Sequence, residues 1–184
     1  MHHLRAAIPA WLEDAENGLT PRFRRLLAGL QADLVSLDHR VAELDAEIAA
    51  IAKTDPAARR LQQLRGVGPV IATALVAAVG DGKQFANGRQ LSAALGLTPR
   101  QHSSGGKERL YGISKRGDTY LRTLLIHGAR AVIRTAKNKD DRLSQWINAL
   151  VARSHTNNAA AALANKTARI AWAMLRNGTE YQPA

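Results

Sequence analysis

The stretch from Thr20 to Lys53 reads TPRFRRLLAGLQADLVSLDHRVAELDAEIAAIAK and carries a regular apolar pattern over four heptads. Its Thr-Pro start is typical of a helix N-cap and first turn. Apolar residues then recur at alternating spacings of four and three: Phe23, Leu27, Leu30, Leu34, Leu37, Val41, Leu44, Ile48 and Ile51. This register predicts one helix from Pro21 to about Lys53, roughly 50 Å long at 1.5 Å per residue.

The apolar seam of this helix needs a partner to cover it, and the sequence is consistent with two possible partners. A coiled-coil arm would pair the seam with another copy of the chain, and this is the favoured interpretation. The alternative is a long helix folded against the chain's own body.

Composition predicts an all-α fold. Of the 184 residues 46% are hydrophobic but only 4% are aromatic, and alanine and leucine supply most apolar positions, which favours packed helices over sheets. We expect a long N-terminal helix and coiled-coil arm (residues 1–54), followed by a compact helical domain (residues 55–184). The absence of cysteine excludes disulfides and zinc fingers.

Charge is divided unevenly between these parts. Residues 1–55 hold 6 Lys/Arg against 9 Asp/Glu, and residues 56–184 hold 20 against 6, so the arm carries about −3 and the body about +14. A basic body of this kind is typical of proteins that bind the phosphate backbone of nucleic acid. The longest apolar run, Val70 to Val79, is shorter than the ~20 residues that cross a bilayer. The sequence therefore predicts a soluble, cytoplasmic protein associated with the nucleoid.

A helix-hairpin-helix motif is predicted over about residues 57–80. Two helical patterns flank Arg65-Gly66-Val67-Gly68-Pro69, in which the glycines permit a tight turn and a close approach of the backbone to a phosphate. The N-terminus of the second helix would offer free amides to that phosphate. A tight corner between two helices, with no ligand, is the alternative.

Further helices are predicted on either side of residue 100. Asn87 caps a short helix over residues 88–95, and Asp118 caps one over residues 119–136. Asp140 and Asp141 begin another, and Asn157 or Asn158 begins the last, which ends at Asn177-Gly178. The C-terminal helices thus span residues 119–177.

The segment from Leu97 to Asp118 is the least helical part of the chain, and it joins adjacent hydroxyls to glycines and cations. Ser103-Ser104-Gly105-Gly106 is surrounded by basic side chains at Arg100, Lys107, Arg109, Lys115 and Arg116. Such a composition suits a phosphate and a nucleophile. Residues 107–113 fit a short strand or hairpin and fit a flexible loop equally well.

A metal site is not predicted within this chain. The few carboxylates of the body, such as Asp118 and Asp141, are better explained as helix caps or turn residues, and the histidines show no ligand spacing. A serine hydroxyl is the remaining nucleophile, with His102 as a candidate for the proton and Arg100, Lys107 and Arg109 to balance charge. By residue chemistry alone, a serine beside two glycines is most often a turn residue.

A wider set of motifs resembles a known family. It comprises Leu64-Arg65-Gly66-Val67-Gly68-Pro69, Ala72-Thr73-Ala74-Leu75, Phe85, Leu91 to Pro99, Ser103 to Lys107, Ile113 to Asp118 and Tyr120-Leu121-Arg122. In this order, over about residues 56–176, it resembles the C-terminal region of insertion-sequence transposases of the IS110 and IS116 type. The resemblance implies a helix-hairpin-helix element, a serine that joins covalently to DNA, and mobilisation with a noncoding bridge RNA that pairs with donor and target DNA.

The resemblance also assigns site residues. The family serine directly precedes glycine and maps onto Ser104, with Ser103 as the competing choice. The hairpin, the serine loop and the helix after it supply the expected DNA contacts: Arg65, Gly66, Gly68, Arg100, Lys107, Arg109, Lys115, Arg116 and Arg122.

One part of the family pattern has no match here. Full-length members carry an N-terminal RNase-H-like domain whose acidic residues bind magnesium and act together with the serine. The heptad arm resembles the coiled coil that links the two domains, so the chain is expected to begin within that linker. We expect no cofactor in this chain, magnesium in the missing domain, and DNA, bridge RNA and further copies of the chain as partners. The alternatives are a noncatalytic DNA-binding and oligomerisation module and a coiled-coil protein without a nucleic acid partner.

Overall fold

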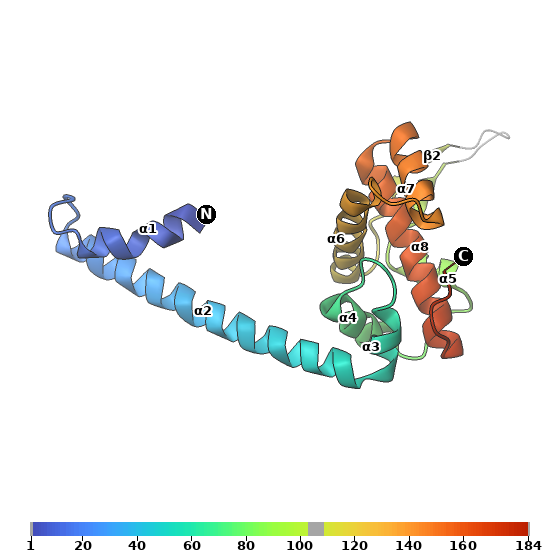
Figure 1. Ribbon diagram of the computed structural model, residues 1–184, viewed down its shortest axis with the longest axis horizontal. Helices are drawn as coiled ribbons and strands as arrows, with labels where there is room; N and C mark the ends of the chain where they lie inside the picture. Colours follow the sequence, from blue (N-terminus) through green and yellow to red (C-terminus); the bar gives the residue numbers. More distant parts are fainter. Residues whose placement is uncertain (1, 103–108, 184) are drawn as a thin grey trace. The chain divides into compact units, whose positions relative to one another are not determined.

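The computed structural model describes residues 2–102 and 109–183, which form eight helices and two short strands (Figure 1). The predicted all-α class is confirmed, with one small antiparallel sheet added to it. The chain divides into two compact units, one ending at Glu47 and the other beginning at Ile48.

The first unit is a helical hairpin. It consists of α1 (His2–Glu13) and most of α2 (Pro21–Thr54). The guanidinium of Arg24 closes the connection between them, because it donates to the main-chain carbonyls of Trp11 at 3.1 Å and Leu12 at 3.0 Å. One side chain at the start of α2 thus holds the end of α1.

Contacts further along bring α1 against α2. Ile8 is buried, and Arg5 of α1 forms an ion pair with Asp38 of α2, 33 residues later in the chain. The predicted long helix is confirmed over Pro21–Thr54.

The apolar seam of α2 nevertheless remains open to solvent. Leu27 and Ile48 are partly buried, whereas the other seven seam positions are 36% to 62% exposed. The exposed positions are Phe23, Leu30, Leu34, Leu37, Val41, Leu44 and Ile51. Helix α1 does not cover this seam.

The second unit contains the end of α2, six further helices and the sheet. The helices are α3 (Pro56–Leu61), α4 (Pro69–Val79), α5 (Gly88–Ala94), α6 (Thr119–Ala136), α7 (Arg142–Arg153) and α8 (Thr156–Asn177). Helix α8 contacts α3, α5, α6 and α7 and therefore forms the centre of the unit (Figure 1). Small buried residues such as Ala160, Ala164, Ala168 and Ala171 line it, which lets the neighbouring helices approach closely.

Side-chain caps begin four of these helices, and those at Asn87, Asp118 and Asp141 are where the sequence predicts them. Asp55, Asn87, Asp118 and Asp141 each accept a hydrogen bond from a main-chain N–H in the first turn of the following helix. The start of α8 was assigned wrongly. His155 is its N-cap, and its Nδ1 accepts from the N–H of Asn157 at 3.2 Å, so Asn157 and Asn158 lie inside the first turn.

Strands β1 (Pro99–Gln101) and β2 (Leu110–Ile113) form an antiparallel ribbon. Pro99 pairs with Ile113 and Gln101 with Leu110, so β2 has one more residue than β1 between the two pairs, which is a bulge. Of the two alternatives for this region, the structure favours the strand over residues 110–113. No described helix is long and apolar enough to cross a membrane.

Candidate functional site

Two glycines, Gly66 and Gly68, lie in the connection between α3 and α4, for which we keep the short name hairpin, and they face different surroundings. The helix-hairpin-helix motif itself stays a prediction. Gly66 has φ of +83°, and a Cβ there would lie 2.7 Å from the carbonyl oxygen of Gly128 in α6. A Cβ at Gly128 would in turn lie 2.1 Å from the carbonyl oxygen of Gly66. The backbones of the hairpin and α6 therefore touch, and Gly66 is a packing residue.

Gly68 faces outward instead. It is the N-cap of α4 with φ of −89°, and no described atom lies within 4 Å of the position a Cβ would take. It supplies no side-chain cap to α4, and Pro69 follows at the first helical position. Of the two glycines, Gly68 is the one whose surroundings leave room for a ligand.

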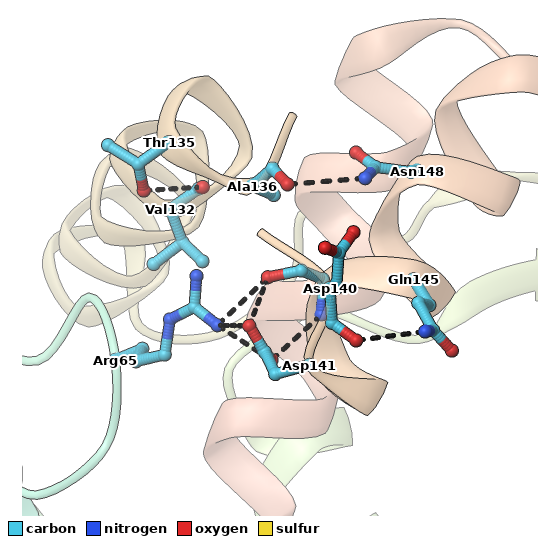
Figure 2. Close-up of polar contacts among 9 residues, drawn as sticks. Arg65, Val132, Thr135, Ala136, Asp140, Asp141, Gln145 and Asn148 are labelled. Carbon is cyan, nitrogen blue, oxygen red and sulfur yellow. Dashed lines mark hydrogen bonds and ion pairs between the residues drawn. The ribbon is translucent and has the colours of Figure 1, made fainter. Parts of the chain in front are cut away.

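Arg65 is turned toward the start of α7 (Figure 2). Its Nη1 donates to both carboxylate oxygens of Asp141, at 2.9 and 3.0 Å, and to Oγ of Ser144 at 3.0 Å. Its Nη2 is buried without a hydrogen-bond partner among the described residues. The guanidinium that the sequence assigns to DNA thus joins the hairpin to α7 in this structure.

The Asp141 carboxylate is held in its charged form. Ser144, which is fully buried, donates its hydroxyl to Asp141 at 2.6 Å and its main-chain N–H at 3.1 Å. The hydroxyl bond is the main cause that lowers the pKa of Asp141 to about 2, and the main-chain N–H and the positive charge of Arg65 add to it.

Arg122 is also used inside the protein. It is 8% exposed, and its guanidinium donates to the carbonyl oxygen of Leu95 at 3.1 Å and to Oγ1 of Thr119 at 3.0 Å. Leu95 is the C-cap of α5, where the helix dipole is negative and a cation is favoured. The predicted DNA contact at Arg122 therefore lies at the junction of α5 and α6.

The chain enters and leaves the β-ribbon through one tightly packed junction. A Cβ at Gly96 would lie 2.0 Å from the carbonyl oxygen of Arg116, and one at Gly117 would lie 1.8 Å from that of Ala94. The N–H of Asp118 bonds to the same Ala94 oxygen at 3.2 Å. The ribbon is therefore fixed at its base to the end of α5 and the start of α6.

Basic side chains lie exposed along the ribbon and next to it. Arg100 is the middle residue of β1, Arg109 precedes β2, and Lys115 and Arg116 follow β2. Lys115 is in the left-handed region, with φ of +57°, which is uncommon for a residue with a side chain. These four predicted DNA contacts are exposed, whereas Arg65 is partly buried and Arg122 is buried.

The predicted nucleophiles Ser104 and Ser103, together with Lys107, lie outside the described residues. Their neighbours in sequence are paired, because the N–H of His102 donates to the carbonyl oxygen of Arg109 at 3.0 Å. Among the described residues, no group of three or more His, Asp or Glu side chains is placed to hold a metal ion.

Sequence reasoning missed two features of this region. It explained Asp141 as a helix cap and overlooked its second role as the partner of Arg65, from which it is 76 residues distant. It also passed over Tyr111, which is 49% exposed and lies edge to face with the ring of His102 at 5.8 Å between centroids. An aromatic residue among basic residues was the available signal.

Comparison with known proteins places these elements in a family. The model of the Transposase IS116/IS110/IS902 family matches residues 58–145, which include the hairpin, the ribbon and α6. A probable family 20 transposase of Pseudomonas aeruginosa is 52% identical over 158 residues, covering 86% of this chain and 47% of that protein.

Two named insertion-sequence transposases are also similar. That of element IS1111A from Coxiella burnetii is 49% identical over 175 residues, or 95% of this chain and 48% of that protein. That of element IS1328 from Yersinia enterocolitica is 40% identical over 166 residues, or 90% and 50%. The chain spans about half the length of these curated relatives. Over the matched residues, it belongs to the IS116/IS110/IS902 family of transposases.

Proposed function

We propose that this chain is the DNA-binding, serine-bearing C-terminal portion of an insertion-sequence transposase. The single observation that carries the proposal is the β-ribbon, which is fixed at its base and has exposed Arg100 and Arg109, one before and one after the predicted serines in the sequence. The net charge of about +14 on residues 56–184 and the family membership support the same interpretation.

The proposed chemistry is a transesterification at a DNA phosphate. The Ser104 oxygen would attack phosphorus and lose its proton to a base, while the bond to a deoxyribose oxygen breaks and that oxygen leaves as a protonated hydroxyl. Arg100 and Arg109 would balance negative charge on the phosphate oxygens. The product is a phosphoseryl ester between protein and DNA, which conserves the energy of the phosphodiester for strand exchange.

The rest of the machinery is assigned to parts outside this chain. The resemblance implies an RNase-H-like domain that binds magnesium and a bridge RNA that pairs with DNA, and we propose both as partners of the complete enzyme. The carboxyl groups of the described residues do not gather into a metal site, so no step is assigned to a metal here.

A suicide DNA substrate tests the nucleophile. With the missing domain supplied, the wild-type chain is expected to form a covalent adduct that survives denaturation, Ser104→Ala is expected to form none, and Ser103→Ala is expected to retain it. An adduct that persists in Ser104→Ala and disappears in Ser103→Ala would transfer the role to Ser103. Persistence in both variants would remove the serine mechanism.

A second candidate function is a noncatalytic DNA-binding and oligomerisation module. The open apolar seam of α2 favours it, because seven large side chains at heptad positions lie 36% to 62% exposed. We propose that a second copy of this chain covers the seam. The two candidate functions are compatible, because a chain that binds DNA and self-associates can also carry the catalytic serine. Formation of the covalent protein–DNA adduct distinguishes the catalytic function from the noncatalytic one.

A further inference from the structure

The outer face of the β-ribbon combines aromatic and basic side chains. The edge-to-face contact between His102 and Tyr111 shows that both rings lie on one face of the ribbon. Arg100 is two residues from His102 along one strand, and Arg109 is two residues from Tyr111 along the other. Side chains alternate along β1, so Arg100 is expected on the face of His102. The N–H of His102 donates to the carbonyl oxygen of Arg109 at 3.0 Å, so these two residues lie opposite each other and Arg109 is expected on that face as well.

The bulge helps to present Tyr111. The extra residue of β2 lies between the Gln101–Leu110 pair and the Pro99–Ile113 pair, which is the part of the strand that contains Tyr111. A bulge re-aims the side chains beside it. The phenol ring remains 49% exposed, and the described chain provides no hydrophobic core around it.

This combination suits an unpaired nucleic acid strand better than a duplex. In a duplex the faces of the bases are stacked on one another and only their edges are accessible, whereas an unpaired base offers a flat face to an aromatic ring. Base–aromatic stacking contributes about 1–3 kcal/mol per base, and flanking cations bind the phosphates. Each of these groups is present on the ribbon face.

We propose that the face formed by Arg100, His102, Arg109 and Tyr111 binds an unpaired stretch of DNA, with one base stacked on Tyr111. The inference rests on the proposed function, because strand exchange requires a strand to leave its duplex beside the cleavage point. Arg100 and Arg109 contact the phosphates on either side of the stacked base.

The test measures binding of the full chain to labelled oligo(dT) of about 12 nucleotides, a length suited to one such binding surface. A matched oligonucleotide with abasic sugars in place of thymidines keeps the phosphates and removes the bases. Tyr111→Ala is expected to weaken oligo(dT) binding at least about 5-fold and to leave binding of the abasic strand unchanged. Tyr111→Phe, which keeps the ring, is expected to bind oligo(dT) as the wild type does.

Tyr120→Ala is the matched control, because Tyr120 is a 61% exposed tyrosine that belongs to α6 and to neither strand of the ribbon. It is expected to leave oligo(dT) binding unchanged. Equal losses for Tyr111→Ala on oligo(dT) and the abasic strand would overturn the inference, as would no loss on either. The same binding is measured with oligo(U) of equal length. If Tyr111→Ala weakens binding of oligo(U) but not of oligo(dT), the inference is overturned and the face is assigned to RNA.

Binding to a DNA duplex distinguishes a failure of this inference from a failure of the proposed function. Wild type and Tyr111→Ala are both expected to bind a DNA duplex equally well. If the wild-type chain fails to bind duplex, the proposed function fails. If duplex binds normally but Tyr111→Ala shows no base-dependent loss, only the stacking face is refuted.

Discussion

At the scale of single residues, the two glycines of the hairpin provide opposite predictions. Gly66→Ala places a methyl group against the Gly128 backbone at a φ of +83°, so we expect a loss of about 1–3 kcal/mol or more in unfolding free energy. Gly68→Ala meets no described atom and is expected to cost less than about 1 kcal/mol while weakening duplex DNA binding. Urea unfolding and a duplex binding assay measure both. Equal destabilisation would contradict the difference in packing.

The carboxylate of Asp141 predicts a dependence of stability on acidity. Its pKa is lowered from 3.8 to about 2 in the folded chain, so its stabilising contribution is complete above about pH 4 and is lost as the pH falls toward 2. Asp141→Asn can still accept the Ser144 N–H but cannot titrate, so its unfolding free energy should decline less over this range than that of the wild type.

Asp140→Asn is the control for this experiment. In Figure 2 the main-chain carbonyl of Asp140, rather than its carboxylate, accepts the bond from Gln145. Its acid profile is expected to follow the wild type. The unfolding free energy is measured by circular dichroism in urea at each pH, and parallel profiles for wild type and Asp141→Asn would exclude a stabilising contribution from the Asp141 charge.

At the scale of elements, the seam of α2 predicts self-association. Leu37 is a seam position and is 52% exposed, whereas Ala46 is exposed on the opposite side of the heptad repeat. Leu37→Lys is expected to reduce association at least about 10-fold, because it places a charge in an apolar seam, and Ala46→Lys is expected to leave it unchanged. Analytical ultracentrifugation over a concentration series measures this. A wild-type chain that stays monomeric would refute the seam as an interface.

Local signals made the helices predictable. The boundaries of α6 were predicted as observed because Asp118 caps it and accepts the N–H of Leu121 at 2.9 Å. The start of α8 was missed because an imidazole rather than an amide side chain caps it, and histidine is an uncommon cap. The starts of α6 and α8 both depend on residues a few positions away in the sequence, and sequence patterns are most informative over this range.

Partners distant in sequence were not predictable in the same way. The sequence predicts Arg65 and Arg122 as DNA contacts, but Arg65 bonds to an acceptor 76 residues away and Arg122 to one 27 residues away. Neither sequence motif indicates Asp141 as the partner of Arg65 or Leu95 as the partner of Arg122, because only tertiary packing brings each pair together. The composition of the ribbon was visible in the sequence, whereas the shared face of His102 and Tyr111 needed the register and the bulge.

At the scale of the whole molecule, the division of charge predicts strongly salt-dependent DNA binding. A body that neutralises six to ten phosphates should lose about 1,000-fold or more in duplex affinity between 50 and 200 mM salt. Arg100→Ala is expected to reduce the slope of log affinity against log salt by about 1, because one phosphate contact is removed. Fluorescence anisotropy measures the slope. An affinity that is flat in salt would contradict phosphate binding altogether.

The central position of α8 has a consequence for synthesis on the ribosome. This helix supplies the surface against which α3, α5, α6 and α7 pack, yet it is the last described helix to emerge. At about 5–20 residues per second, the earlier helices of the second unit wait several seconds with their apolar faces uncovered. The α2 seam has emerged by then, so neighbouring nascent chains on one messenger can meet through it before either body is complete. Assembly of the protein is then expected to begin during translation, with subunits preferentially drawn from the same messenger.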